Sequence, residues 1–259
     1  MANIRLGYNF DTWDAASITS SSDASAGLAG ANVVDDFVGK PWRTAVDADV
    51  NLVFDLGGAT KLTEIGIFAF NLTSAATVQV QANNADAWGA PPLADTIPIV
   101  TDADGEVIEI LMWFGDETYQ YWRIRIQDAA NPDTYIEIGR IAGCEYWTPT
   151  RGIGDGFQYI PDDPSEGSPA PGRQDYYRER KRFRKVAVTF SAMGRTDREK
   201  WEAVFSKVGK SHPVILSLDA TNYPTKDSMY CYIQTPLTFA HRILEFYNLG
   251  TIVFGEVTE

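Results

Sequence analysis

Apolar and polar residues alternate along much of this chain, which is the pattern of strands that bury one face of a sheet. The clearest example is residues 121–143, where the alternating run 122–126 is followed by a second run at 136–138. The stretch between the two runs is rich in Asp, Asn and Pro, residue types that favour turns. We therefore expect an antiparallel pair of strands joined by an ordered polar loop.

Further strands are predicted on the N-terminal side of this pair. They cover residues 51–57, 62–70, 77–82 and 107–114. Trp88 lies in the middle of a predicted loop, and Trp42 precedes the strands of the sandwich, with core packing favoured for its side chain. The order of strands and turns fits a sandwich of about eight antiparallel strands.

A helical pattern is found in the C-terminal part, over residues 197–208. Four apolar side chains recur there at positions i, i+3, i+4 and i+7, namely Trp201, Val204, Phe205 and Val208. Thr196 and Glu199 have the spacing of a capping box, and Gly209 can end the helix. The apolar stripe should pack on a sheet formed by predicted strands at residues 213–218, 229–233, 243–247 and 251–257.

Glycine and proline are concentrated in residues 148–172, between the two patterned regions. Such a density disfavours both helix and sheet, so this segment is predicted to join two domains. We expect a β-sandwich over residues 1–148, a Gly/Pro-rich linker over 149–172, and a β-sandwich or α+β domain with one flanking helix over 173–259.

Two stretches resemble a known family. Residues 51–57, with the sequence Asn-Leu-Val-Phe-Asp-Leu-Gly, lead into the apolar run 62–70 and resemble the core of discoidin-like (galactose-binding-like, coagulation factor type C) domains, which are jelly-roll β-sandwiches. Together with residues 121–143 they look like the variant of this domain found in tail proteins of long-tailed phages. The closing strand 252–256 is similar to that of tail-tube and distal-tail proteins.

Charge is distributed unevenly over the 259 residues, whose net charge is −13. Residues 1–150 hold 7 Lys and Arg against 21 Asp and Glu, a net charge of −14, whereas residues 151–259 hold 15 against 14, a net charge of +1. An acidic half repels nucleic acid and anionic membranes, so neither is expected as a partner. The first residues do not resemble a signal peptide and no apolar run is long enough to span a bilayer, so we expect assembly in the host cytoplasm and no membrane insertion.

Residues for catalysis or metal binding are scarce. His212 and His241 are the two histidines, and Cys144 and Cys231 stand apart without a CxxC motif, so we expect no metal, no cofactor and no enzymatic activity. Free thiols are favoured for the two cysteines, with a bridge between them left open. Residues 102–105 resemble part of a calcium loop but lack its first and last ligands, which favours a tight turn.

The resemblance implies a structural subunit of a phage tail tip or baseplate. Its partners would be copies of itself in a hexameric or trimeric ring and other phage tail proteins, and its location the virion. The alternative is a carbohydrate-binding module for host surface glycans, whose candidate residues are Phe70, Asn71, Trp88 and Trp113.

The basic stretch 178–185 has three interpretations. They are a solvated strand face, a nucleic-acid site, and a subunit interface that uses opposite charge. In the third interpretation Arg180, Arg182 and Arg184 contact the acidic first domain of a neighbouring copy.

Overall fold

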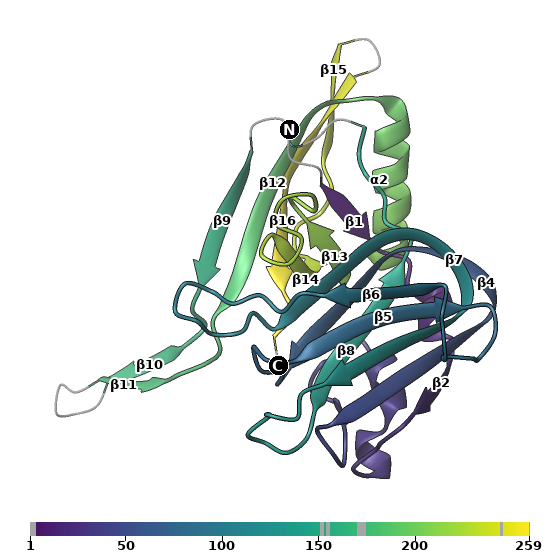
Figure 1. Cartoon of the computed structure of the whole chain (residues 1–259). Coiled ribbons are helices and arrows are strands. Elements are labelled where there is room, and N and C mark those ends of the chain that lie inside the picture. The colour runs from purple at the N-terminus through teal and green to yellow at the C-terminus, as the bar shows by residue number, and fades with distance from the viewer. Residues whose placement is uncertain (1–3, 151–152, 154–155, 170–174, 244–245, 259) are drawn as a thin grey trace. The chain divides into compact units, whose positions relative to one another are not determined.

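A computed structural model describes residues 4–150, 153, 156–169, 175–243 and 246–258, which form two compact units. The N-terminal unit comprises Arg5–Thr148 and Ile215–Met229, and the C-terminal unit comprises Met1–Ile4, Pro149–Val214 and Tyr230–Glu259. Both are built mainly from antiparallel strands (Figure 1), so the expected mainly β fold is confirmed.

Two long strands form the framework of the N-terminal unit. β4 (Asp49–Phe70) and β7 (Ile110–Gln127) pair antiparallel along almost their full lengths, with register shifts between Asp55 and Thr60 and between Leu62 and Glu64. Gly57 lies at the first shift with a positive φ of 74°, a conformation that glycine adopts without strain. An irregularity of this kind lets a strand bend, so each strand can serve both layers of a sandwich.

Shorter strands complete the two layers. β2 (Ser17–Ser20) pairs with the first half of β4, and β5 (Thr77–Asn83) pairs with the second half of β7 and with β6 (Leu93–Ile97). β8 (Glu137–Cys144) pairs with the second half of β4 and with β3 (Trp42–Arg43). β1 (Arg5–Gly7) pairs with residues Ile215–Ser217 of β13 (Val214–Ser217).

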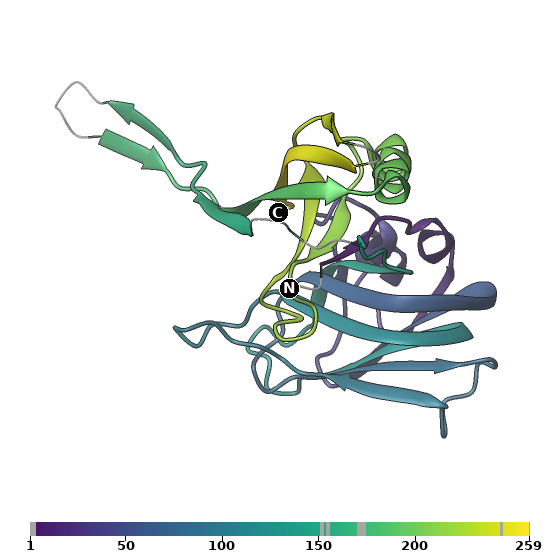
Figure 2. The same cartoon turned by 90° about the horizontal axis from the view of Figure 1, so that it is seen from above.

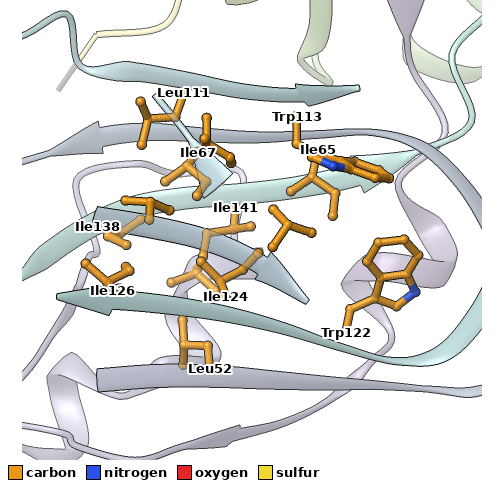
Figure 3. Packing of buried hydrophobic residues seen from close by; sticks show 14 of the residues in the cluster. Leu52, Ile65, Ile67, Leu111, Trp113, Trp122, Ile124, Ile126, Ile138 and Ile141 are labelled. Carbon is orange, nitrogen blue, oxygen red and sulfur yellow. The ribbon is translucent and has the colours of Figure 1, made fainter. Parts of the chain in front are cut away.

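The core lies between the two halves of these strands (Figure 3). Leu52, Ile124 and Ile126 come from one half and Ile65 and Ile67 from the other, and all five are fully buried. The period-two pattern that predicted Ile124 and Ile126 as inward-facing is confirmed, as is the prediction that Trp42 is a core residue.

Strand boundaries and one pairing differ from expectation. The predicted strands 51–57 and 62–70 are one strand, β4, and 107–114 continues through 122–126 as β7. The expected direct pairing of 121–126 with 136–138 is wrong, because β4 lies between β7 and β8. The two segments pair with opposite halves of β4, so the polar loop that joins them crosses from one layer to the other.

Small elements close the N-terminal unit around a buried charge. They are α1 (Asp11–Asp14), η1 (Ala26–Leu28) and η2 (Gly30–Val34). The guanidinium of Arg140 on β8 is fully buried and pairs with Asp14 at 2.8 Å and with Asp36 at 3.5 Å. A buried cation needs such partners, so this ion pair links α1 to β8.

The C-terminal unit contains a sheet and one long helix. β12 (Phe183–Met193) pairs with β9 (Phe157–Asp162) and β16 (Phe246–Glu256), and β16 also pairs with β15 (Phe239–Ile243) and with Cys231–Ile233 of β14 (Ser228–Ile233). The expected single strand over residues 243–247 is wrong, because Ile243 ends β15 and Phe246 begins β16, and the two residues are partners in this antiparallel pair.

Helix α2 (Arg195–Val208) confirms the predicted apolar stripe. Trp201, Val204 and Val208 are buried, and the Trp201 ring lies 5.2 Å from that of Phe190 on β12. The predicted capping box is wrong, since Gly194 is the N-cap and Glu199 pairs with Arg195 instead. Gly209 ends the helix with a positive φ of 55°, as its position predicted.

The segment expected to be a linker contains strands. β9 and β10 (Glu166–Pro169) both lie within residues 149–172, of which 151–152, 154–155 and 170–172 are outside the described residues. Pro161 lacks an N–H group, but β9 pairs on one side only with β12 among the described strands. Proline is tolerated in such an edge strand, which is why composition alone gave the wrong answer here.

Candidate functional site

A two-stranded hairpin of the C-terminal unit is called the arm from here on. It consists of β10 and β11 (Asp175–Arg178), which pair with each other antiparallel as a separate sheet. Figures 1 and 2 show it extending away from β9 and β12. Tyr176 and Tyr177 on β11 are 66% and 67% exposed. Two strands alone enclose no apolar core. An isolated hairpin of this kind is therefore marginally stable at best in water.

Exposed apolar side chains continue from the arm onto β9. Phe157, Tyr159 and Ile160 are all more than a third exposed, although they belong to a paired strand. Large apolar side chains on an edge strand provide a template for another chain to bind. Both the arm and β9 therefore expose large apolar side chains.

Two of the three interface arginines lie at the base of the arm. Arg180 pairs with Glu166 at 2.9 Å, and Arg182 pairs with Asp163 at 3.1 Å. With Ser165, Tyr177 and Glu179 they line a hollow of about 480 Å³. Both guanidinium groups are exposed, and each internal pair leaves further N–H donors of its guanidinium available.

Arg184 has a different position from the other two. It is largely buried and hydrogen-bonds through its guanidinium to Glu256 on the neighbouring strand β16. Its guanidinium also bonds to the Tyr159 hydroxyl at 3.2 Å. These partners give Arg184 a role in the packing of the sheet, and its contact with a neighbouring copy stays a prediction.

The four candidate glycan residues do not form one site. Phe70 is buried in the sandwich core, and Trp113 is only 5% exposed. Asn71 lies at the end of β4, where its side chain donates to Asp133 at 3.0 Å and to the Tyr135 carbonyl at 3.1 Å. Trp88 lies in the β5–β6 loop, and the Arg123 guanidinium lies 4.5 Å from the centre of its ring. Three separate places are involved, and Phe70 offers no ring face for stacking.

Trp113 contributes to an open groove of about 350 Å³ on the N-terminal unit. Its Nε1–H donates to Asp95 at 2.8 Å, which fixes the indole against the core (Figure 3). The groove is also lined by Pro98, Phe114 and Pro224. Apolar walls with one carboxylate suit a small ligand with hydroxyl groups, because the walls contact carbon and the carboxylate accepts hydrogen bonds.

A polar network fixes the loops after β4 and β7. Asp128 accepts hydrogen bonds from the Thr73 N–H at 2.8 Å and from the Thr73 hydroxyl at 2.6 Å. Asn131 donates to the Asn71 carbonyl at 3.0 Å and to Asp128 at 3.1 Å. These side chains are used to hold the loops in place, which assigns the ordered polar loop a structural role.

One buried acid has a strongly perturbed pKa. Burial raises the pKa of Glu64 to about 8, while the Cys144 thiol, which donates to it at 3.3 Å, and the charge of Arg5 oppose the shift. Burial likewise raises the pKa of Cys144, which is a free thiol, as is Cys231. A perturbed acid can serve in catalysis when it faces a cleft, but Glu64 is fully buried.

Metal sites and membrane-spanning helices each have a defined geometry, against which the described residues can be compared. Within the described ranges, no group of three His, Cys, Asp or Glu side chains is arranged to hold a metal ion. Residues 102–105 form a tight turn, in which Asp102 accepts hydrogen bonds from the N–H groups of Asp104 and Glu106. Of the helices in the described part of the chain, none is long and apolar enough to cross a membrane.

No protein-family model and no curated protein matches the chain. Among solved structures, chitosan-binding module 1 of a chitosanase/glucanase from Paenibacillus sp. IK-5 is 20% identical over 51% of this chain and 95% of that module, with a TM-score of 0.40. The lectin domain of lectinolysin, solved with Lewis B antigen, is 14% identical over 51% of this chain and 93% of that domain, with a TM-score of 0.39. A GH29 fucosidase of Ruminococcus gnavus is 18% identical over 51% of this chain and 25% of its own length, with a TM-score of 0.41. The matched proteins thus include carbohydrate-binding and lectin modules, at a similarity too low to transfer any ligand to this chain.

The arm and its tyrosines were missed by sequence reasoning. The stretch 175–178 is short, and its neighbouring prolines and glycines indicated a linker. Asp95 was missed as well, because nothing in the sequence connects it to Trp113, eighteen residues away. The two adjacent tyrosines at 176–177, followed by arginines at 178, 180 and 182, were a signal that could have pointed to an interaction surface.

Proposed function

We propose that this chain is a non-catalytic structural subunit of a protein assembly, and that the assembly is a phage tail tip or baseplate, as the sequence resemblance implies. In this proposal, copies of the chain form a hexameric or trimeric ring that contacts other tail proteins in the virion. Assembly takes place in the host cytoplasm, without nucleic acid or membrane as a partner.

The observation that carries the proposal is the exposed arm. Tyr176 and Tyr177 lie on a two-stranded hairpin, and the edge strand β9 exposes further large apolar side chains. Tyrosine and arginine are enriched at protein interfaces, where their large side chains exclude water and still form hydrogen bonds. A surface of this composition gains stability when a second protein covers it.

The test is the mass of the full-length chain and of two variants in solution, measured by mass photometry. The wild-type chain should form particles of several times the 28.7 kDa subunit mass. Tyr176→Ser combined with Tyr177→Ser should shift these particles to monomers while the Tm stays unchanged, because neither side chain is buried within the subunit.

Tyr223→Ser provides the matched control, since Tyr223 is an exposed tyrosine of the N-terminal unit. This control should assemble like the wild type. A wild-type chain that stays monomeric at every concentration would contradict the proposal, and so would a paired tyrosine variant that assembles normally.

A second candidate function is binding of a host surface glycan. The observation that favours it is the Trp113 groove, which is lined by the half-buried aromatic ring of Phe114 and by the Asp95 carboxylate. Sugars present both C–H faces and hydroxyl groups, and this combination complements both. The two functions are compatible, because the groove and the arm belong to different units.

A glycan array probed with the full-length chain tests the second function. Asp95→Ala should remove any binding that the groove provides, whereas Asn84→Ala in the exposed β5–β6 loop should leave it unchanged. Binding that survives Asp95→Ala would place the glycan elsewhere, and an array without signal would remove the function.

A further inference from the structure

The arm carries a local positive charge on its C-terminal side. Residues 178–182 contain Arg178, Arg180, Lys181 and Arg182 against the single acid Glu179. The hollow at the base of the arm is lined by two of these cations together with Asp163 and Glu179. Glu166 pairs with Arg180 and Asp163 pairs with Arg182, so the four cations of this stretch face three acids, which leaves a net charge of +1.

The N-terminal unit carries the opposite charge in a long uninterrupted stretch. Residues 62–122 contain nine Asp and Glu and neither Lys nor Arg. Among the nine, Glu64, Asp86 and Asp116 interact with cations outside this stretch, namely Arg5, Arg123 and Lys61. The stretch itself contributes negative charge only.

One narrow hairpin concentrates that charge at the surface. Thr101 and Val107 form an isolated bridge, and Asp102 ties the turn by accepting two backbone N–H groups. Asp104 and Glu106 project from this turn, and both are exposed. Neither carboxylate takes part in an ion pair recorded among the described residues.

We propose that the acidic 101–107 hairpin of one copy docks at the arm of a second copy, with Asp104 and Glu106 facing Arg180 and Arg182. The inference rests on the proposed function and names the partner of the arm as this same chain. Tyr176 and Tyr177 supply the apolar contact, and the charges determine which surface of the second copy binds. Exposed pairs of this kind contribute register and partner choice more than affinity.

The arrangement has a consequence for symmetry. The arm and the acidic hairpin are different surfaces on different units, so each copy offers one of each. If each copy uses its arm on one neighbour and its hairpin on another, the interface is heterologous, and it generates a ring when the rotation between copies closes. A two-fold dimer would instead need both contacts to form reciprocally between the same two copies.

The test exchanges the charges of the two surfaces in the full-length chain. Arg180→Glu with Arg182→Glu, and separately Asp104→Lys with Glu106→Lys, should each weaken self-association in 0.15 M salt, where the Debye length is about 8 Å, by roughly tenfold. Asp102 is left intact because it holds the turn. Combining all four changes in one chain should restore association to within about threefold of wild type, since the opposite charges face each other again.

Mixing the two double variants distinguishes contact between copies from contact within one copy. The mixture should associate where each variant alone does not, because each brings the surface that complements the other. The charge-matched control is Lys207→Glu with Lys210→Glu, both exposed at the end of α2, and it should associate like the wild type.

The outcomes separate the two levels of the proposal. If the wild type associates and neither double variant weakens it, or if neither the combined chain nor the mixture restores association, this pairing of surfaces is wrong while the proposed function stands. If the wild type itself does not associate, the proposed function fails first.

Discussion

Glu64 shows how a single buried side chain makes the stability of this fold depend on pH. Its folded-state pKa of about 8 lies above its ordinary value of 4.5 because burial disfavours the charged form. The folded state therefore binds the proton more tightly than the unfolded state. The resulting stabilisation is complete below pH 4.5 and is lost as the pH rises through 8.

A first prediction follows for Glu64→Gln, which keeps the size of the side chain and removes its charge. As the pH rises from 5 to 9, the wild type should lose free energy of unfolding and the variant should not. The loss should reach at most about 5 kcal/mol, since each unit of pKa shift corresponds to about 1.36 kcal/mol. Thermal unfolding followed over this pH range measures the difference. Glu106→Gln, an exposed acid, should track the wild type, and a Glu64→Gln curve parallel to it would refute the buried-proton account.

Residue types predicted burial better than they predicted roles. Trp42 was correctly placed in the core because a tryptophan beside strand residues has little alternative. Phe70 and Trp113 were expected near binding loops, but both are buried, since they lie within β4 and β7. The sequence does not show whether an aromatic residue near the end of a strand packs in the core or is exposed beside a loop. Only the three-dimensional packing distinguishes these two positions.

Helix α2 gives a second prediction, at the scale of one element. Gly209 ends it with φ 55° and ψ −132°, a conformation that residues with a side chain rarely adopt. Gly209→Ala should lower the free energy of unfolding by about 1–3 kcal/mol, measured by urea denaturation. Gly89→Ala in an exposed loop, where a Cβ meets nothing, should change it by less than about 0.5 kcal/mol. If both variants changed the free energy of unfolding equally, the conformation of residue 209 would not require glycine.

Elements with a strong apolar periodicity could be predicted from the sequence. Elements that depend on pairing with distant parts of the chain could not. The stripe of α2 repeats over two turns, so its existence and extent followed from the sequence. β9 escaped prediction because its apolar side chains are exposed and it contains Pro161. The helix start was misplaced because Asp197 accepts hydrogen bonds from the N–H and hydroxyl of Thr150, a contact between distant residues that outweighs the local capping pattern.

Negative and positive charges are concentrated in different parts of the chain. An acidic N-terminal unit and a basic stretch beside the arm allow copies to attract one another in one orientation and repel in others. This asymmetry was readable from composition alone. The surfaces that carry it were not, because the 101–107 hairpin and the arm are recognisable only once the strands around them are placed.

A third prediction follows from screening. Raising the salt concentration from 0.05 M to 0.5 M shortens the Debye length by about threefold, so association that depends on exposed charges should weaken. Sedimentation velocity of the wild type should show a smaller assembled fraction at the higher concentration. In the Arg180→Glu, Arg182→Glu variant like charges face each other, so its association should strengthen as the salt concentration rises. A wild type that associates more strongly in high salt would indicate an apolar interface without steering charges.

The most direct test of assembly through the arm is a photo-cross-linking group placed at Tyr177 in the full-length chain. Irradiation should join two copies, and peptide mapping should locate the second attachment within residues 62–122 of the other copy. The same group at the exposed position Tyr223 should give no such product. If the group at position 177 gives cross-links only within one copy, or none at all, the proposed assembly through the arm is contradicted.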